Sequence, residues 1–87
     1  MKSEKISLFL YRAKLEDDSR KLKDKDRSEL HKVQKLLKKI SQDKFELTIE
    51  DNNVIYNSLM NELKTLNKYG IIGRKKEVEE KINQYSN

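Results

Sequence analysis

The sequence contains no cysteine, no proline and no tryptophan, and only two glycines among its 87 residues. The absence of cysteine excludes disulfide bonds and thiolate chemistry, and it fits a reducing compartment. The absence of proline, with so little glycine, favours helices joined by short links over a sheet with many tight turns. The longest apolar run, from Leu8 to Tyr11, is far too short to span a bilayer. We therefore expect a soluble, cytoplasmic protein.

Charge is abundant and unevenly distributed along the chain. Charged residues make up 40% of the sequence, and the formal net charge is +5. Residues 1–44 contain 14 Lys and Arg against 8 Asp and Glu, whereas residues 45–87 contain 6 against 7. An anionic partner should therefore meet the first half of the chain. The length predicts one domain, residues 1–87, of modest stability.

The stretch over residues 48–69 has the clearest helical pattern. Its apolar residues recur at steps of three and four, which places them on one face: Ile55, Leu59, Leu63 and Leu66. Thr48 is a suitable N-cap, and Asp51 follows it at the spacing of a capping box. Gly70 suits the left-handed residue that ends a helix. The pattern predicts a helix of about six turns with one buried stripe.

Three further helices are expected around this one, over residues 3–18, 26–42 and 74–85. The second has the regular seam Leu30, Val33, Leu37 and Ile40. The last offers only Val78, Ile82 and Tyr85. The almost wholly charged residues 16–25 should form a solvated connection or a frayed helix end. Short links favour antiparallel neighbours, so the predicted fold is all-α, an antiparallel up-down four-helix bundle, with a three-helix bundle and a loose tail as the alternative.

The first predicted helix is apolar on two sides. One stripe consists of Ile6, Phe9, Leu10 and Ala13. The other, roughly opposite, consists of Leu8, Tyr11 and Leu15. Such a helix is either wedged between neighbours or leaves one side for another chain. We expect wedging, because apolar stripes in a small bundle serve the core first; the alternative is a homodimer or adaptor that uses the stripe of Leu8 and Leu15.

Residues suited to catalysis or metal binding are sparse. His31 is the single histidine, and no second histidine or cysteine stands at ligand spacing from it. Glu16, Asp17 and Asp18 are adjacent, so their side chains point in different directions and cannot converge as an acid–base pair. The segment 70–73 lacks the strand and the Lys-Ser/Thr of a phosphate loop. We expect a non-catalytic protein without a metal or another cofactor.

The outer side of the second predicted helix carries a row of lysines: Lys32, Lys35, Lys38 and Lys39. Such a row can contact phosphates or an anionic membrane face, although most Lys-rich outer faces are only solvated. Glu29 and Asp43 dilute the positive charge only at its ends. A helix-turn-helix would use the outward residues Asn57, Asn61 and Lys64, but the preceding link is not a tight Gly-containing turn.

A second candidate surface lies at the bend before the last helix: Ile71, Ile72, Arg74, Lys75 and Lys76. Tucked beneath the bundle, these residues would close the core, which is the interpretation that the sequence favours. Left outside, they would form a partner-binding patch. Val54 falls on the polar side of the main helix and could join an exposed site.

Three parts of the chain together resemble a known family. One is the segment 26–40, DRSELHKVQKLLKKI, with an acidic-basic start followed by spaced leucines and lysines. Another is the segment 45–63, FELTIEDNNVIYNSLMNEL, which opens on Leu-Thr and acidic residues. The third is the short final helix after a glycine-containing bend. In these features the chain is similar to the immunity proteins that accompany class II bacteriocins, the enterocin A and lactococcin A immunity type.

The resemblance implies a four-helix bundle in the cytoplasm, or at the inner face of the membrane, that protects its producer from a pore-forming peptide. It implies a partner, the mannose phosphotransferase membrane complex with bound bacteriocin. It also implies recognition by the C-terminal half, which here includes Ile71, Ile72, Arg74, Lys75 and Lys76. Bacteriocin immunity is therefore the favoured hypothesis. The alternative is a small basic nucleic-acid-binding or regulatory protein.

Overall fold

The computed structural model describes residues 2–19, 24–42 and 45–86. Within these ranges the chain forms four α-helices and no strand: α1 (Lys2–Ser19), α2 (Asp24–Ile40), α3 (Ile49–Tyr69) and α4 (Lys75–Tyr85). The predicted all-α fold is confirmed, with helix limits within two residues of those expected. The charged connection predicted over residues 16–25 is helical at both ends, and its centre, residues 20–23, lies outside the described residues.

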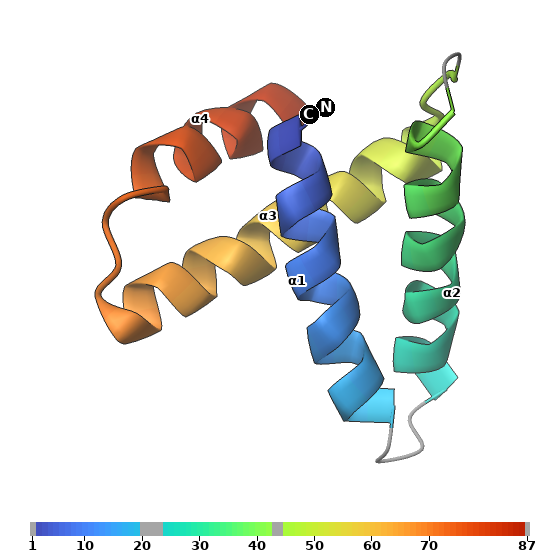
Figure 1. Cartoon of the computed structure of the whole chain (residues 1–87), viewed down its shortest axis with the longest axis horizontal. Helices are drawn as coiled ribbons and strands as arrows, with labels where there is room; N and C mark the ends of the chain where they lie inside the picture. The colour runs from blue at the N-terminus through green and yellow to red at the C-terminus, as the bar shows by residue number, and fades with distance from the viewer. Residues whose placement is uncertain (1, 20–23, 43–44, 87) are drawn as a thin grey trace.

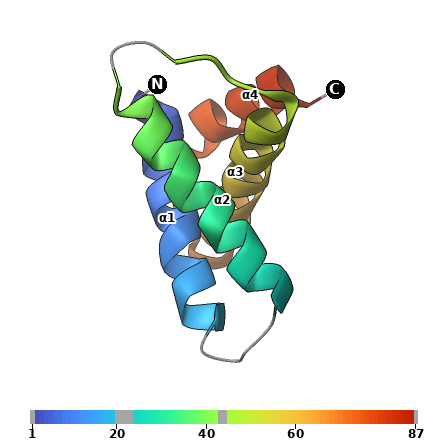
Figure 2. The same ribbon diagram turned by 90° about the vertical axis from the view of Figure 1, so that its right-hand side faces the viewer.

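The helices are arranged as two pairs. α1 and α2 lie side by side and run in opposite directions (Figures 1 and 2). α3 crosses behind α1 in Figure 1, and α4 folds back along α3 after the bend between them. The contacts of α3 with α1 and with α2 therefore join the two pairs.

α3 has both of the caps that its sequence predicts. Thr48 Oγ1 accepts a hydrogen bond from the Asp51 backbone N–H at 3.0 Å, and the Asp51 carboxylate accepts one from the Thr48 N–H at 2.9 Å, which completes the capping box. Gly70 follows the helix with φ 67°, in the left-handed region. The N–H of Ile71 donates to the carbonyl of Leu66 at 2.9 Å, the long-range bond of a Schellman motif. These bonds fix the direction in which the chain leaves α3.

One hydrophobic core draws on all four helices. Its buried side chains are Leu8, Leu15, Val33, Leu36, Leu37, Ile40, Val54, Ile55, Leu59, Leu66 and Val78. The stripes predicted for α2, α3 and α4 face this core, and Phe45 and Leu47 pack half-buried against it. The prediction for Val54 is wrong, because its side chain is only 3% exposed. Val54 and Leu36 line the same groove, so α2 covers the side of α3 that the sequence assigned to solvent.

α1 is not wedged between neighbours, and that prediction is wrong. Leu8 and Leu15 are buried and Tyr11 is half-buried, so the stripe that they form faces the core. The opposite stripe faces outward, with Ile6, Phe9 and Leu10 exposed by 40%, 47% and 46%. Two helices, α2 and α3, pack closely against α1. The alternative of a dimer through Leu8 and Leu15 is wrong for the same reason, since both side chains are in the core.

Candidate partner-binding site

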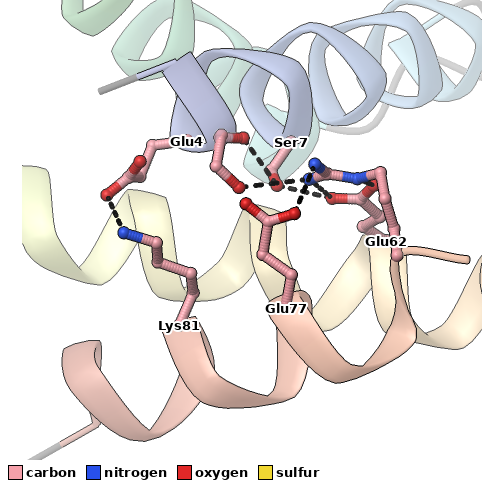
Figure 3. Close-up of polar contacts among 7 residues, drawn as sticks. Glu4, Ser7, Glu62, Glu77 and Lys81 are labelled. Atoms are coloured by element: carbon pink, nitrogen blue, oxygen red, sulfur yellow. Dashed lines mark hydrogen bonds and ion pairs between the residues drawn. The ribbon is translucent and has the colours of Figure 1, made fainter.

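A buried cluster of polar side chains lies where α1, α3 and the start of α4 meet (Figure 3). Its centre is Glu62 of α3, which is 2% exposed. Ser7 of α1 donates its hydroxyl to Glu62 Oε1 at 2.5 Å. Arg74 donates Nε to Glu62 Oε2 at 2.7 Å and Nη2 to Oε1 at 3.0 Å. Arg74 Nη2 also donates to Ser3 Oγ at 3.4 Å, and Nη1 lies 3.5 Å from Glu77. The two-pronged guanidinium matches both oxygens of the buried carboxylate.

The far end of α4 is also held against α1 by polar contacts. Glu4, which is buried, accepts hydrogen bonds from Tyr85 Oη at 2.8 Å and from Lys81 Nζ at 3.3 Å. Burial acts to raise the pKa of Glu4. Hydrogen bonds from Tyr85 and from the backbone, together with the charge of Lys81, outweigh this effect, so the pKa of Glu4 lies below its usual value. Burial and the bond to Glu4 raise the pKa of Tyr85. Side chains thus tie α4 to α1 at both ends, with Val78 buried between them.

The sequence contains a signal for this cluster that the apolar pattern overlooks. Glu62 lies three residues after Leu59 and four before Leu66, in the middle of the stripe that faces the core. A carboxylate at the centre of a buried stripe requires a cation close by. Arg74 meets that requirement, and its hydrogen bond to Glu62 raises the pKa of the guanidinium.

The predicted partner-binding residues of the bend are mostly outside the core. We name Ile71, Ile72, Lys75 and Lys76 the bend surface, since all four are exposed or half-exposed, the two isoleucines between α3 and α4 and the two lysines at the start of α4. Ile72 is 82% exposed and Ile71 is 49% exposed, so the favoured interpretation that they close the core is wrong. The turn at Gly70 leads the chain away from the core before α4 returns. Arg74, the fifth predicted residue, is directed inward to the buried cluster. Sequence reasoning missed the adjacent Tyr69, which is 66% exposed.

The predicted anion-binding residues lie on the solvent side of α2. Lys32, Lys35 and Lys38 are exposed, and Lys39 is half-buried. Lys39 Nζ lies 2.5 Å from Asp51 Oδ2 at the start of α3, so this cation already has a partner. Three of the four lysines, without Lys38, line a groove of about 640 Å³ between α2 and α3, together with Arg27 and His31.

A larger groove of about 850 Å³ lies between α1, α2 and α3. Glu29 Oε2 accepts hydrogen bonds there from Tyr11 Oη at 2.7 Å and from Asn57 Nδ2 at 3.0 Å. Burial and the bond to Glu29 raise the pKa of Tyr11. Met60 and Leu63 add apolar surface to lining side chains of both charges. The sequence pattern does not reveal this groove, because three separate helices contribute to it.

Two kinds of polar arrangement are absent from the described part of the chain. Across residues 2–19, 24–42 and 45–86, no three side chains of His, Cys, Asp or Glu are grouped so that they could hold a metal ion. In the same ranges every buried side-chain nitrogen and oxygen has a hydrogen-bond partner. The buried polar atoms of the cluster around Glu62 are therefore satisfied within the protein.

Comparison of the chain with protein-family models, curated proteins and solved structures found no match. Among the helices of the described ranges, none is both long and apolar enough to cross a bilayer.

Proposed function

We propose that this protein is a bacteriocin immunity protein, a non-catalytic binding protein that protects its producer cell from a pore-forming class II bacteriocin. It works from the cytoplasm, or from the inner face of the membrane, by engaging the mannose phosphotransferase complex with bound bacteriocin. The resemblance of residues 26–40 and 45–63 to the enterocin A and lactococcin A immunity type supports this proposal, as does the all-α fold. We also propose the antiparallel up-down bundle arrangement, supported by the opposite directions of α1 and α2 (Figure 1).

The exposure of the bend surface carries the proposal. Ile72 is 82% exposed beside the half-exposed Ile71, and Lys75 and Lys76 adjoin them. An apolar centre with a polar rim is the composition of a protein-binding interface. The polar contacts at both ends of α4 hold this surface on a fixed support. Binding of a partner therefore costs little conformational entropy for the ordering of flexible segments.

Expression in a bacteriocin-sensitive strain tests the proposal. The protein should confer resistance to at least one class II bacteriocin in a panel. Ile72→Asp should reduce protection at least about tenfold in bacteriocin dose, because it places a charge in the apolar centre of the interface. Ile49→Asp is the matched control, since Ile49 is 81% exposed at the first turn of α3, where an acid is favourable. Absence of protection across the panel, or equal loss in both variants, would reject the proposal.

Nucleic-acid binding or regulation is the second candidate function, favoured by the groove between α2 and α3. Arg27, Lys32 and Lys35 line one wall, and Glu50 is an acid on the other. Cations in a concave surface suit a phosphate backbone. Retention on DNA or RNA should weaken steeply with salt and with Lys32→Glu and Lys35→Glu, whereas Lys38→Glu, outside the groove, should change it little. Equal retention of all three variants would exclude this groove.

A further inference from the structure

Two polar side chains decide which side of α1 faces the core. Because both sides of α1 are apolar, burial of apolar surface alone does not choose between them. Ser7 and Glu4 make the choice, since Ser7 donates to the buried Glu62 and Glu4 accepts from Lys81. The two side chains are 0% and 5% exposed. The helix thereby buries a hydroxyl and a carboxylate and leaves large apolar side chains exposed to solvent. This combination marks an interaction surface.

The exposed side has an apolar centre and basic edges. We name Ile6, Phe9, Leu10 and Ala13, all exposed, the outer face of α1. At 100° per residue these four positions fall within about 100° of one another. Four cations border them: Lys2, Lys5, Arg12 and Lys14. The Arg12 guanidinium lies 5.0 Å from the centre of the Phe9 ring. Two acids follow at the C-terminal end, Glu16 and Asp17, and Glu16 lies 3.7 Å from Arg12 Nε.

We propose that the outer face of α1 docks on the surface of an anionic lipid bilayer. Ile6, Phe9 and Leu10 enter the boundary between headgroups and acyl chains, as the apolar side of an interfacial helix does. The bordering lysines and Arg12 then contact lipid phosphates. This inference goes beyond the proposed immunity function and rests on a different part of the molecule.

A bilayer fits this face better than a second copy of the chain does. Two copies that met through α1 would bring together two faces that each carry four cations against two acids, at a net like-charge cost. A helix of 18 residues is about 27 Å long and about 10 Å wide. That footprint is far below the roughly 800 Å² per partner that a stable interface buries. A bilayer has no such area requirement and supplies the opposite charge.

A single fluorescent reporter tests the docking directly. The sequence has no tryptophan, so Phe9→Trp places the only one in the outer face. Vesicles of phosphatidylcholine mixed with phosphatidylglycerol should shift its emission to the blue and carry the protein into the pellet. Pure phosphatidylcholine vesicles should do so less, and added salt should weaken the effect. Met60→Trp is the matched control, because Met60 is 42% exposed on α3, and its emission should not shift.

A second set of variants separates docking from folding. Ile6→Gln, Phe9→Gln and Leu10→Gln, combined, should lower vesicle binding at least about tenfold, and glutamine keeps the helix propensity. Helix content and the unfolding midpoint should stay near those of the parent, since these side chains lie outside the core. No vesicle binding, or equal binding by the Gln variant, would overturn the proposal.

Self-association is the remaining outcome that would overturn it. A blue shift of Phe9→Trp without vesicles, with a doubled mass in light scattering, would assign the outer face to a second copy. The assay contains no bacteriocin and no receptor, so its failure leaves the immunity proposal standing. Loss of protection in Ile72→Asp, conversely, has no bearing on vesicle binding.

Discussion

Arg74 and Glu62 join across the bend between α3 and α4 through two hydrogen bonds, Nε to Oε2 at 2.7 Å and Nη2 to Oε1 at 3.0 Å. Arg74 stands at the N-cap of α4 but makes no side-chain cap bond there, because a guanidinium has no acceptor for a backbone N–H; its side chain donates to Glu62 of α3 instead. The Glu62 carboxylate is 2% exposed and has Ser7 as its other partner. The pair therefore fixes where α4 begins and what it packs against.

Arg74→Ala should lower the free energy of unfolding by about 2–4 kcal/mol. The substitution leaves the buried Glu62 charge with only the Ser7 hydroxyl. Urea titration measures the change. Arg12→Ala is the control, since it removes an exposed pair with Glu16 and should cost at most about 1 kcal/mol. Similar small losses in the two variants would show that Glu62 does not depend on Arg74.

Leu8→Ala and Leu10→Ala should differ strongly, because the two leucines lie on opposite sides of α1. Leu8 is 0% exposed, so its truncation should cost about 2–5 kcal/mol in the free energy of unfolding. Leu10 is 46% exposed, and its truncation should cost less than about 1 kcal/mol. Chemical denaturation of both variants checks the orientation of the helix. Equal losses would be inconsistent with the observed side facing the core.

A comparison of α3 with α1 shows which features of the fold could be predicted from the sequence. The limits of α3 were predictable because Thr48, Asp51 and Gly70 act within a few residues of the ends that they cap. The side of α1 that faces the core was not predictable, because both sides of this helix carry similar apolar residues. The deciding contact joins Ser7 to Glu62, 55 positions away, and local periodicity carries no information about it.

The candidate sites also combine features that local periodicity predicts with features that depend on tertiary contacts. The solvent side of α2 followed from periodicity, so the exposure of Lys32, Lys35 and Lys38 was predictable. The pairing of Lys39 with Asp51 was not, because it depends on how α2 and α3 approach each other. The exposure of Ile72 depends likewise on the path of the chain after Gly70, which an apolar residue in a short link does not reveal.

Gly70→Ala should destabilise the protein by about 1 kcal/mol. The cause is the backbone alone: φ is 67°, and an added Cβ would meet no heavy atom within 4 Å. Gly73→Ala is the matched control, because an added Cβ there also meets nothing and its φ lies outside the positive range. It should be neutral or stabilising by up to about 1 kcal/mol. Thermal or urea unfolding that ranked the two variants in the opposite order would contradict the left-handed cap.

Stability should fall in acid as Glu4 and Asp51 take up protons. The ordinary pKa is 4.5 for the Glu4 carboxyl and 3.8 for the Asp51 carboxyl, and in the folded protein the pKa of each lies below that value. For Asp51, burial acts to raise the pKa, and the hydrogen bonds from Lys39 and Thr48 outweigh that effect. Such a carboxylate stabilises the fold above its unfolded pKa, and this contribution is lost as pH falls through the folded value. The free energy of unfolding should thus decrease below about pH 4.5.

A series of urea midpoints from neutral to acid pH measures this loss. Glu4→Gln cannot ionise, so it should start lower at neutral pH and decline less steeply in acid. A decline as steep as that of the parent protein would mean that the contacts of Glu4 with Lys81 and Tyr85 do not contribute to the acid sensitivity.

The contacts of Glu4 also bear on how the protein is made. Glu4 and its partner Tyr85 are 81 positions apart, so a ribosome produces the first long before the second. A nascent chain that has α1 and α3 but not yet α4 has no partner for Glu4, so only the bond from Ser7 to Glu62 favours the observed side of α1. Synthesis of α4 adds the partners of Glu4, Lys81 and Tyr85. We therefore expect a protein truncated before Arg74 to retain helical content without a unique tertiary structure.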